Sequence, residues 1–215
     1  MYHPPHFAGQ DPRIAARLMR EHPLASLITV DEEGLPFVSH LPLHLMEEGG
    51  VFVLLGHMAR SNPQWRHLAA RPRATVTFLG PHAYLPARVY PDLARVPTWN
   101  YLAVHCRVTA RLLAQDDTTG KDRLLKALIG DHEPAYAQQW RDLGAEFQRK
   151  MLAGIAAFEL AVEGWQCKLK LNQHRKESHA TQYAAYVAGT PNERALAGWM
   201  RTLGMTPAPV TSNKE

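Results

Sequence analysis

The sequence has no apolar run long enough to cross a bilayer, and it has few cysteines. Its apolar stretches, such as "VFVLL" at 51–55, are far shorter than the roughly 20 residues that a membrane-spanning helix needs. The N-terminal "MYHPPHF" has neither the basic start nor the apolar run of a signal peptide. Cys106 and Cys167 match no metal-ligand or redox spacing. We therefore expect a soluble cytoplasmic protein with reduced thiols and no membrane partner.

A large charge excess is also missing, since the 215 residues carry a net charge of only +4. Residues 1–163 hold 17 basic and 17 acidic side chains, whereas residues 164–215 hold 7 basic and 3 acidic ones. The whole excess therefore lies in the C-terminal part. Such a segment suits a phosphate-bearing ligand or nucleic acid, and it equally suits a solvated helix surface.

Short strands joined by polar turns dominate the pattern. Alternating apolar residues predict strands at 24–30, 35–46, 51–57, 73–80, 98–114, 155–162 and 165–171, with turns at 31–34 and 47–50 and an irregular loop at 81–97. Helices are predicted from Asp11-Pro12, from Asn62 to about Ala70, around 124–129, around 147–152, and over 176–188 and 192–203. The prolines within 35–46 indicate an edge strand or a bulge. Regular strand–helix alternation is absent, so we predict an antiparallel β-barrel with peripheral helices.

A corner that suits an anion follows the third strand, in "GHMARSNPQW" at 56–65. The first backbone N–H groups of a helix have no partner within it and carry the positive end of its dipole. Ser61 and Asn62 can add hydrogen bonds there, and Arg60 a charge-assisted pair. Ser, Asn and Pro are also common at the start of a helix, so a simple helix cap is the alternative.

A second polar, cationic corner is "KLKLNQHR" at 168–175. Lys168 and Lys170 alternate with leucines, so both point the same way in a strand. Gln173 and Arg175 follow at a strand-to-helix corner. An anion site and a lysine-protected sheet edge are both consistent with this pattern.

Several stretches together resemble the PaiB family of FMN-binding negative transcriptional regulators. They are "MYHPPHF", "HPLASLIT" with "LPFVSHLPLHL", "GHMARSNPQW", "HAYLPARVYP" with "VPTWNY", and "KLKLNQHR". The resemblance runs from Met1 to about Arg175. It implies a split β-barrel, mainly β with peripheral helices (α+β), similar to that of pyridoxamine-phosphate oxidase. It also implies a homodimer with FMN at the subunit interface.

The resemblance carries functional residues over to matching positions. The corner after the third strand would meet the FMN phosphate, and the second strand would lie along the flavin ring. The C-terminal motif would close the site, from the same subunit or from the partner. The cofactor-binding residues implied are Ser39, His40, Leu41, His57, Arg60, Ser61, Asn62, Lys170, Gln173 and Arg175. The C-terminal motif departs from the family pattern, with Leu169, Asn172 and Lys176 in place of tryptophan, serine and proline.

Three functions are weighed on this basis. The first is an FMN-binding regulator, for which DNA is a partner implied by the family alone, because the last helix has only Arg194 and Arg201 as basic residues. The second is an FMN-dependent oxidoreductase, with His40, His57 or Tyr101 as possible proton donors. The third is a haem or metal binder, suggested by twelve histidines and the spacing of His40 and His44.

We predict a barrel with inserted helices over 1–171, a helical extension packed on it over 172–206, and a flexible tail over 207–215.

Overall fold

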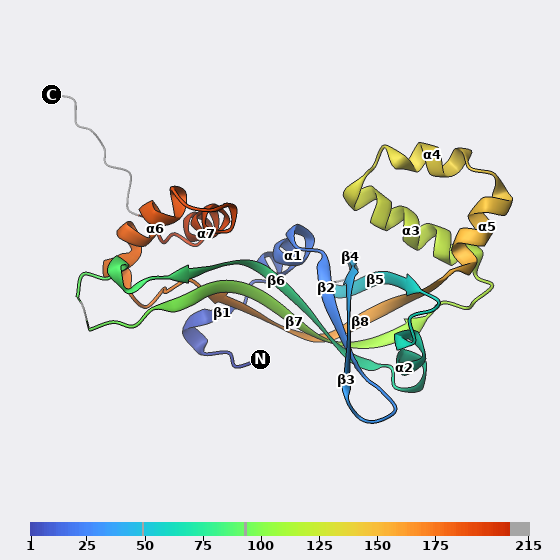
Figure 1. The fold of residues 1–215 in the computed structure, drawn as a ribbon, viewed down its shortest axis with the longest axis horizontal. Coiled ribbons are helices and arrows are strands. Elements are labelled where there is room, and N and C mark those ends of the chain that lie inside the picture. The colour runs from blue at the N-terminus through green and yellow to red at the C-terminus, as the bar shows by residue number, and fades with distance from the viewer. Residues whose placement is uncertain (49, 93, 207–215) are drawn as a thin grey trace. The chain divides into compact units, whose positions relative to one another are not determined.

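The computed structural model describes residues 1–48, 50–92 and 94–206, and the chain divides into two compact units (Figure 1). Unit 1 comprises Met1–Gln10, Leu79–Ala103 and Cys167–Glu215, and unit 2 comprises Asp11–Phe78 and Val104–Gln166. Three long strands continue from one unit into the other. The predicted tail at 207–215 lies outside the described residues, as do Gly49 of the predicted turn at 47–50 and Leu93 of the predicted loop at 81–97. The predicted division into a barrel over 1–171, a helical extension over 172–206 and a tail stays a prediction.

An antiparallel sheet with peripheral helices is the frame, as the sequence predicts. Among the described residues it has eight strands in the order β3-β2-β6-β7-β8-β5-β4, with β1 paired to β8. Pairing is antiparallel for β2 with β3 and β6, and for β8 with β5 and β1. The strands are β1 (Ala8–Gly9), β2 (Leu24–Val30), β3 (Pro36–Pro42), β4 (His44–Glu48), β5 (Val51–Ala59), β6 (Arg73–Leu85), β7 (Thr98–Leu112) and β8 (Ile155–Lys170).

Unit 2 curls into a barrel because β3, at one end of the strand order, also contacts β5 near the other end. Gly56 of β5 lies at a close approach within the barrel, since a Cβ there would stand 2.4 Å from Leu43 and 2.9 Å from Phe158. Five helices belong to this unit: α1 (Pro12–Glu21), α2 (Gln64–Ala70), α3 (Thr118–His132), α4 (Tyr136–Asp142) and α5 (Ala145–Ala153). Leu124 and Leu128 of α3 pack on Leu55 and Ala157, forming a separate small core.

Unit 1 holds the last two helices, α6 (His179–Val187) and α7 (Pro191–Thr202), and the short 3-10 turns η1 (Pro5–Phe7), η2 (Ala87–Val89) and η3 (Lys176–Ser178). Asn100 of β7 donates to the Tyr186 hydroxyl of α6 at 3.0 Å. Thr190 and Glu193 form a capping box at the start of α7. Helix α7 contacts α6 and buries Leu196, Ala197, Trp199 and Met200.

The differences from the predicted elements have local causes. The strand expected at 35–46 breaks at Leu43 into β3 and β4, because the chain turns a barrel corner after Pro42; the edge prediction is confirmed. The strands expected at 155–162 and 165–171 are one strand, and β6 runs on to Leu85 through the predicted loop. Helix α4 was not predicted, since only Trp140 in it is buried and its apolar signal is weak.

Candidate functional site

The corner between β5 and α2 joins two of the predicted site residues. Asn62 donates from Nδ2 to Ser39 Oγ of β3 at 2.9 Å, and its Oδ1 accepts from the Gln64 backbone N–H at 3.0 Å. The helix begins two residues later than predicted, at Gln64, with Pro63 rather than Asn62 as its N-cap residue, and the two bonds of Asn62 fasten the start of α2 to β3. Because α2 has only seven residues and Asn62 already occupies the Gln64 amide, the positive charge here comes from side chains more than from the helix dipole.

Gln64 positions this corner, although no sequence signal singled it out. The side chain is fully buried, and its Nε2 donates to Leu27 O at 2.9 Å and Phe37 O at 3.0 Å, with Thr29 Oγ1 at 3.2 Å. Phe37 also packs on His67 of α2, with ring centroids 5.1 Å apart. One amide therefore ties α2 to both β2 and β3. Its position after Pro63, just inside a helix, was the only available hint.

Arg60 is held by its backbone and leaves its guanidinium available. Its N–H donates to Gly154 O at 2.8 Å, and its carbonyl accepts from Trp65 Nε1 at 3.0 Å. The guanidinium stacks over the Trp65 ring at 3.8 Å. Among the described residues no carboxylate pairs with it. Stacking fixes the plane of an arginine while its N–H edges stay free to donate, and Ser61 beside it is exposed.

His57 lies three residues earlier on β5, on the face that also carries Leu55. Its Nδ1 is buried and has no hydrogen-bond partner in the described part of the chain. Burial lowers the pKa of this imidazole, so it is neutral at pH 7. A neutral histidine with an unused ring nitrogen can still donate or accept one hydrogen bond.

The three residues predicted on the second strand do not share a face. Ser39 pairs with Leu27 and Leu41 with Ala25, whose side chains are buried inside the barrel. His40 pairs with Ser26 on the opposite face and contacts its hydroxyl through Nδ1 at 3.0 Å. Successive side chains of a strand alternate, so one flat ring cannot meet all three side chains from one side.

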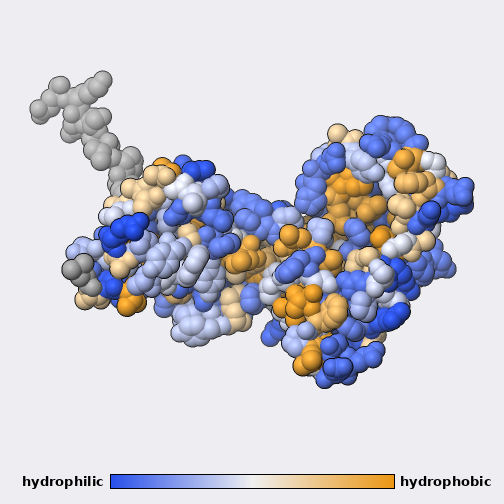
Figure 2. Space-filling model, viewed as in Figure 1, coloured by the Kyte–Doolittle hydropathy of each residue, from blue (hydrophilic) through white to orange (hydrophobic). Residues whose placement is uncertain are grey.

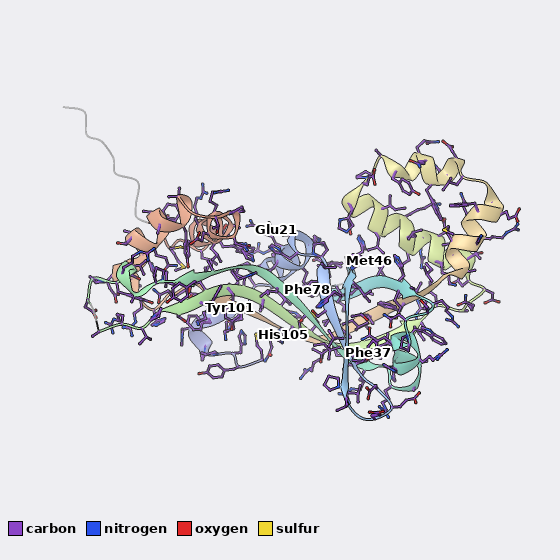
Figure 3. All side chains as sticks on the ribbon, in the orientation of Figure 1. Glu21, Phe37, Met46, Phe78, Tyr101 and His105 are labelled. Carbon is purple, nitrogen blue, oxygen red and sulfur yellow. The ribbon has the colours of Figure 1, made fainter. Side chains whose placement is uncertain are left out.

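The C-terminal cluster lies wholly in unit 1. Lys168 and Lys170 point the same way, as predicted, because both ammonium groups lie over the Tyr101 ring, at 5.2 and 5.8 Å. Tyr101 is labelled on β7 in Figure 3. Lys168 donates to Tyr2 O at 3.0 Å and Lys170 to Thr98 Oγ1 at 2.7 Å. Burial is the main cause that lowers the pKa of Lys170.

The residues after β8 have unequal roles. The Gln173 side chain hydrogen-bonds nearby backbone, accepting from Leu171 N at 3.0 Å and donating to Leu169 O. Asn172 has a positive φ of 69° and is buried, donating to Ser178 Oγ at 2.9 Å. Arg175 is half-buried, and its guanidinium has no hydrogen-bond partner in the described residues. Of these three, only Arg175 offers free donors to a ligand.

Two further findings concern alternatives raised by the sequence. No group of three or more His, Cys, Asp or Glu side chains among the described residues is placed to hold a metal ion. Of the predicted histidine pair, His40 contacts Ser26 and His44 contacts Asp131 Oδ2 at 2.6 Å. No helix in the described ranges is both long and apolar enough to cross a membrane.

The fold defines a class, the split β-barrels. Two solved structures share the fold: the FAD and heme binding protein from Mycobacterium smegmatis, at TM-score 0.59 and 22% identity over 76% of this chain and 73% of that one, and the flavocytochrome Anf3 from Azotobacter vinelandii, at TM-score 0.59 and 19% identity over 76% and 69%.

Within that class the family is also shown. Residues 1–164 match the family described as "Putative FMN-binding domain". The chain is 32% identical over 193 residues to protease synthase and sporulation protein PAI 2 of Bacillus subtilis (strain 168), covering 90% of each. The chain belongs to this FMN-binding family, which confirms the PaiB resemblance and FMN as the family cofactor.

Proposed function

We propose that this protein holds FMN with the phosphate at the β5–α2 corner and acts as a homodimeric, FMN-binding regulator. The observation that carries the proposal is the arrangement of three donors on a fixed frame. Asn62 is locked to Ser39, Ser61 is exposed, and the Arg60 guanidinium is oriented by Trp65 without an acidic partner.

The donor set fits a phosphate monoester. An arginine fork matches two phosphate oxygens at once, and a hydroxyl and an amide supply further donors. FMN, when bound, supplies redox chemistry of its own, so the protein needs to bind and orient it rather than assemble an acid–base pair. His57 adds one neutral hydrogen-bonding nitrogen beside the corner. Ser39 acts by holding Asn62, and Lys170, Gln173 and Arg175 remain predicted contributors from the C-terminal motif.

The phosphate assignment is tested by comparing FMN with riboflavin. Protein freed of flavin is titrated with each compound while quenching of flavin fluorescence is followed. Loss of charge-assisted hydrogen bonds worth about 1.5–3 kcal/mol predicts that riboflavin binds about 10- to 100-fold more weakly. Equal affinity for the two compounds would place the phosphate elsewhere, and no binding of either would contradict the whole proposal.

A homodimer is supported by the outer face of β2 and β3. No residue of β3 is buried, although five of its seven residues are apolar. On the same face Leu24 is 67% exposed and Val38 48% exposed, and Figure 2 shows hydrophobic residues gathered over these strands. An apolar patch of this kind on a sheet commonly marks a protein interface.

The dimer is tested by placing a charge on that face. Val38→Lys should shift the sedimenting species from dimer to monomer in analytical ultracentrifugation. Val51→Lys, at a valine 51% exposed outside the patch, is the matched control and should leave the dimer intact. A monomeric native protein, or a dimer unaffected by Val38→Lys, would contradict this interface.

The regulatory role rests on the family resemblance and on the printed name of the Bacillus subtilis relative, which concerns protease synthesis and sporulation. The packed face of α7 supports a role in folding for that helix rather than insertion into DNA. An electrophoretic shift of genomic promoter fragments at low salt tests DNA binding. The absence of any shift would remove DNA as a partner, and FMN-dependent turnover of NADH or NADPH would favour the oxidoreductase alternative instead.

A further inference from the structure

A cavity of about 330 Å³ lies within unit 1. None of the residues of the β5–α2 corner lines it. It is bounded by the N-terminal turn, the segment before β7, the start of β7, and the chain leaving β8. Its lining includes His6, Phe7, Arg95, Lys170, His174 and Arg175. A volume of this size is at the lower end of the range for small-molecule sites, about 300–1,000 Å³.

The charge of this lining has one sign. Three cations reach it, Lys170, Arg95 and Arg175, and no aspartate or glutamate is among the lining residues. Lys170 contacts the Thr98 hydroxyl rather than a carboxylate, and only Arg95 is paired, with Asp92 at 3.2 Å. Glu177 acts on this region only through its charge, at Tyr90 and His174. Lys170 and Arg175 have no ion-pair partner among the described residues, so these two cations destabilise one another, and an anion between them removes that penalty.

One wall of the cavity is aromatic. Phe7 forms a cluster of three rings with two imidazoles, its ring centroid lying 4.1 Å from that of His6 and 5.7 Å from that of His174, in edge-to-face arrangements. His6 and His174 are themselves 5.2 Å apart. Burial is the main cause that lowers the pKa of His174, so this ring is neutral at pH 7. An apolar, planar wall beside cationic groups suits a ligand with a flat body and a charged end.

We propose that this cavity binds a small organic anion, whose carboxylate or phosphate meets Lys170 and Arg175 and whose planar part lies against Phe7. Two sources share this chemistry: a separate small molecule, which would be a substrate or effector of the protein, and the phosphate-bearing end of the flavin nucleotide itself. The site is formed by residues of one unit, so the proposal does not depend on the β5–α2 corner holding FMN.

The test uses the full chain freed of flavin, with benzoate as the probe and benzyl alcohol as its neutral counterpart. Isothermal titration should show benzoate binding and benzyl alcohol binding at least about tenfold more weakly, because the charged contact is lost. Arg175→Gln should weaken benzoate by about tenfold or more. Lys176→Gln, which removes the same charge from an exposed neighbour outside the lining, should change it less than twofold.

Further arms separate the two sources. If FMN displaces benzoate from the protein and riboflavin does not, the cavity takes the flavin phosphate; if both bind together, the occupant is a separate molecule. Arg60→Gln leaves the cavity lining intact, so benzoate binding retained in this variant shows that the cavity works even if the corner proposal fails. Equal binding of benzoate and benzyl alcohol, or unchanged benzoate binding in both Arg175→Gln and Lys170→Met, would overturn the inference.

Discussion

Replacing the buried amide of Gln64 tests whether the corner depends on the packing beneath it. Gln64→Leu keeps nearly the same volume but removes the donor to the Leu27 and Phe37 carbonyls. A buried acceptor left without a donor costs about 1–3 kcal/mol, so two give about 2–6 kcal/mol. Gln64 Oε1 is itself buried without a partner, and its removal returns about 1–3 kcal/mol of this.

The net expectation is a loss of about 2 kcal/mol. For a chain of this length that lowers the midpoint of thermal unfolding by roughly 4–8 °C. Circular dichroism measures the midpoint, and a flavin titration of the same variant should show weaker FMN binding because the frame of Asn62 loosens. Gln139→Leu on the exposed surface of α4 is the control and should change the midpoint little. An equal, small change in both variants would refute the structural role assigned to Gln64.

Three further outcomes follow from single residues. Asn172→Ala should lower the free energy of unfolding in urea by about 2–3 kcal/mol, because alanine is strained in the left-handed conformation and the hydrogen bond to Ser178 is lost. Asn172→Gly should recover about 1 kcal/mol of this loss, because glycine adopts that conformation without strain. Equal losses in the two variants would contradict the backbone strain. The pKa of His57 is lowered in the folded state, so the unfolded state binds more protons and stability falls as pH drops below about 6.5. His57→Gln should flatten that part of the stability–pH curve. An unchanged slope in this variant would contradict the assigned role of His57. Burial raises the pKa of the Cys167 thiol to about 12, and Cys106 is buried too, so neither should react with Ellman's reagent at pH 8 until guanidinium unfolds the protein; rapid native labelling would contradict this.

The helices and strands were predicted well where their limits are set by neighbouring residues in the chain. Asp11 accepts from the Arg13 N–H ahead of α1, as the Asp-Pro pair indicated, and β2 covers the predicted residues. The long strand β8 was divided in the prediction because Gly164 and polar neighbours interrupt its apolar pattern. In the structure Arg107 packs over Gly164, a long-range contact that no local window contains.

The sequence predicted which residue types meet at the candidate site better than it predicted which way their side chains point. Asn62 and Gln64 come together because a hydrogen bond between residues two apart in the chain is a local property. The alternation of Ser39, His40 and Leu41 follows from strand geometry, yet which face is inside depends on pairing with β2. Gln173 stays a predicted ligand residue, and its amide also hydrogen-bonds the backbone at the end of β8, a local role that sequence alone does not show.

The most direct measurement is FMN affinity in a matched pair of charge variants. Arg60→Gln removes the guanidinium that lies 3.8 Å over Trp65, while Arg66→Gln removes an exposed one at 5.3 Å from the same ring. At low salt, fluorescence titration should show FMN bound about 10- to 100-fold more weakly by Arg60→Gln and less than about twofold more weakly by Arg66→Gln. Equal affinities for the two variants and the native chain would mean that the phosphate does not sit at this corner.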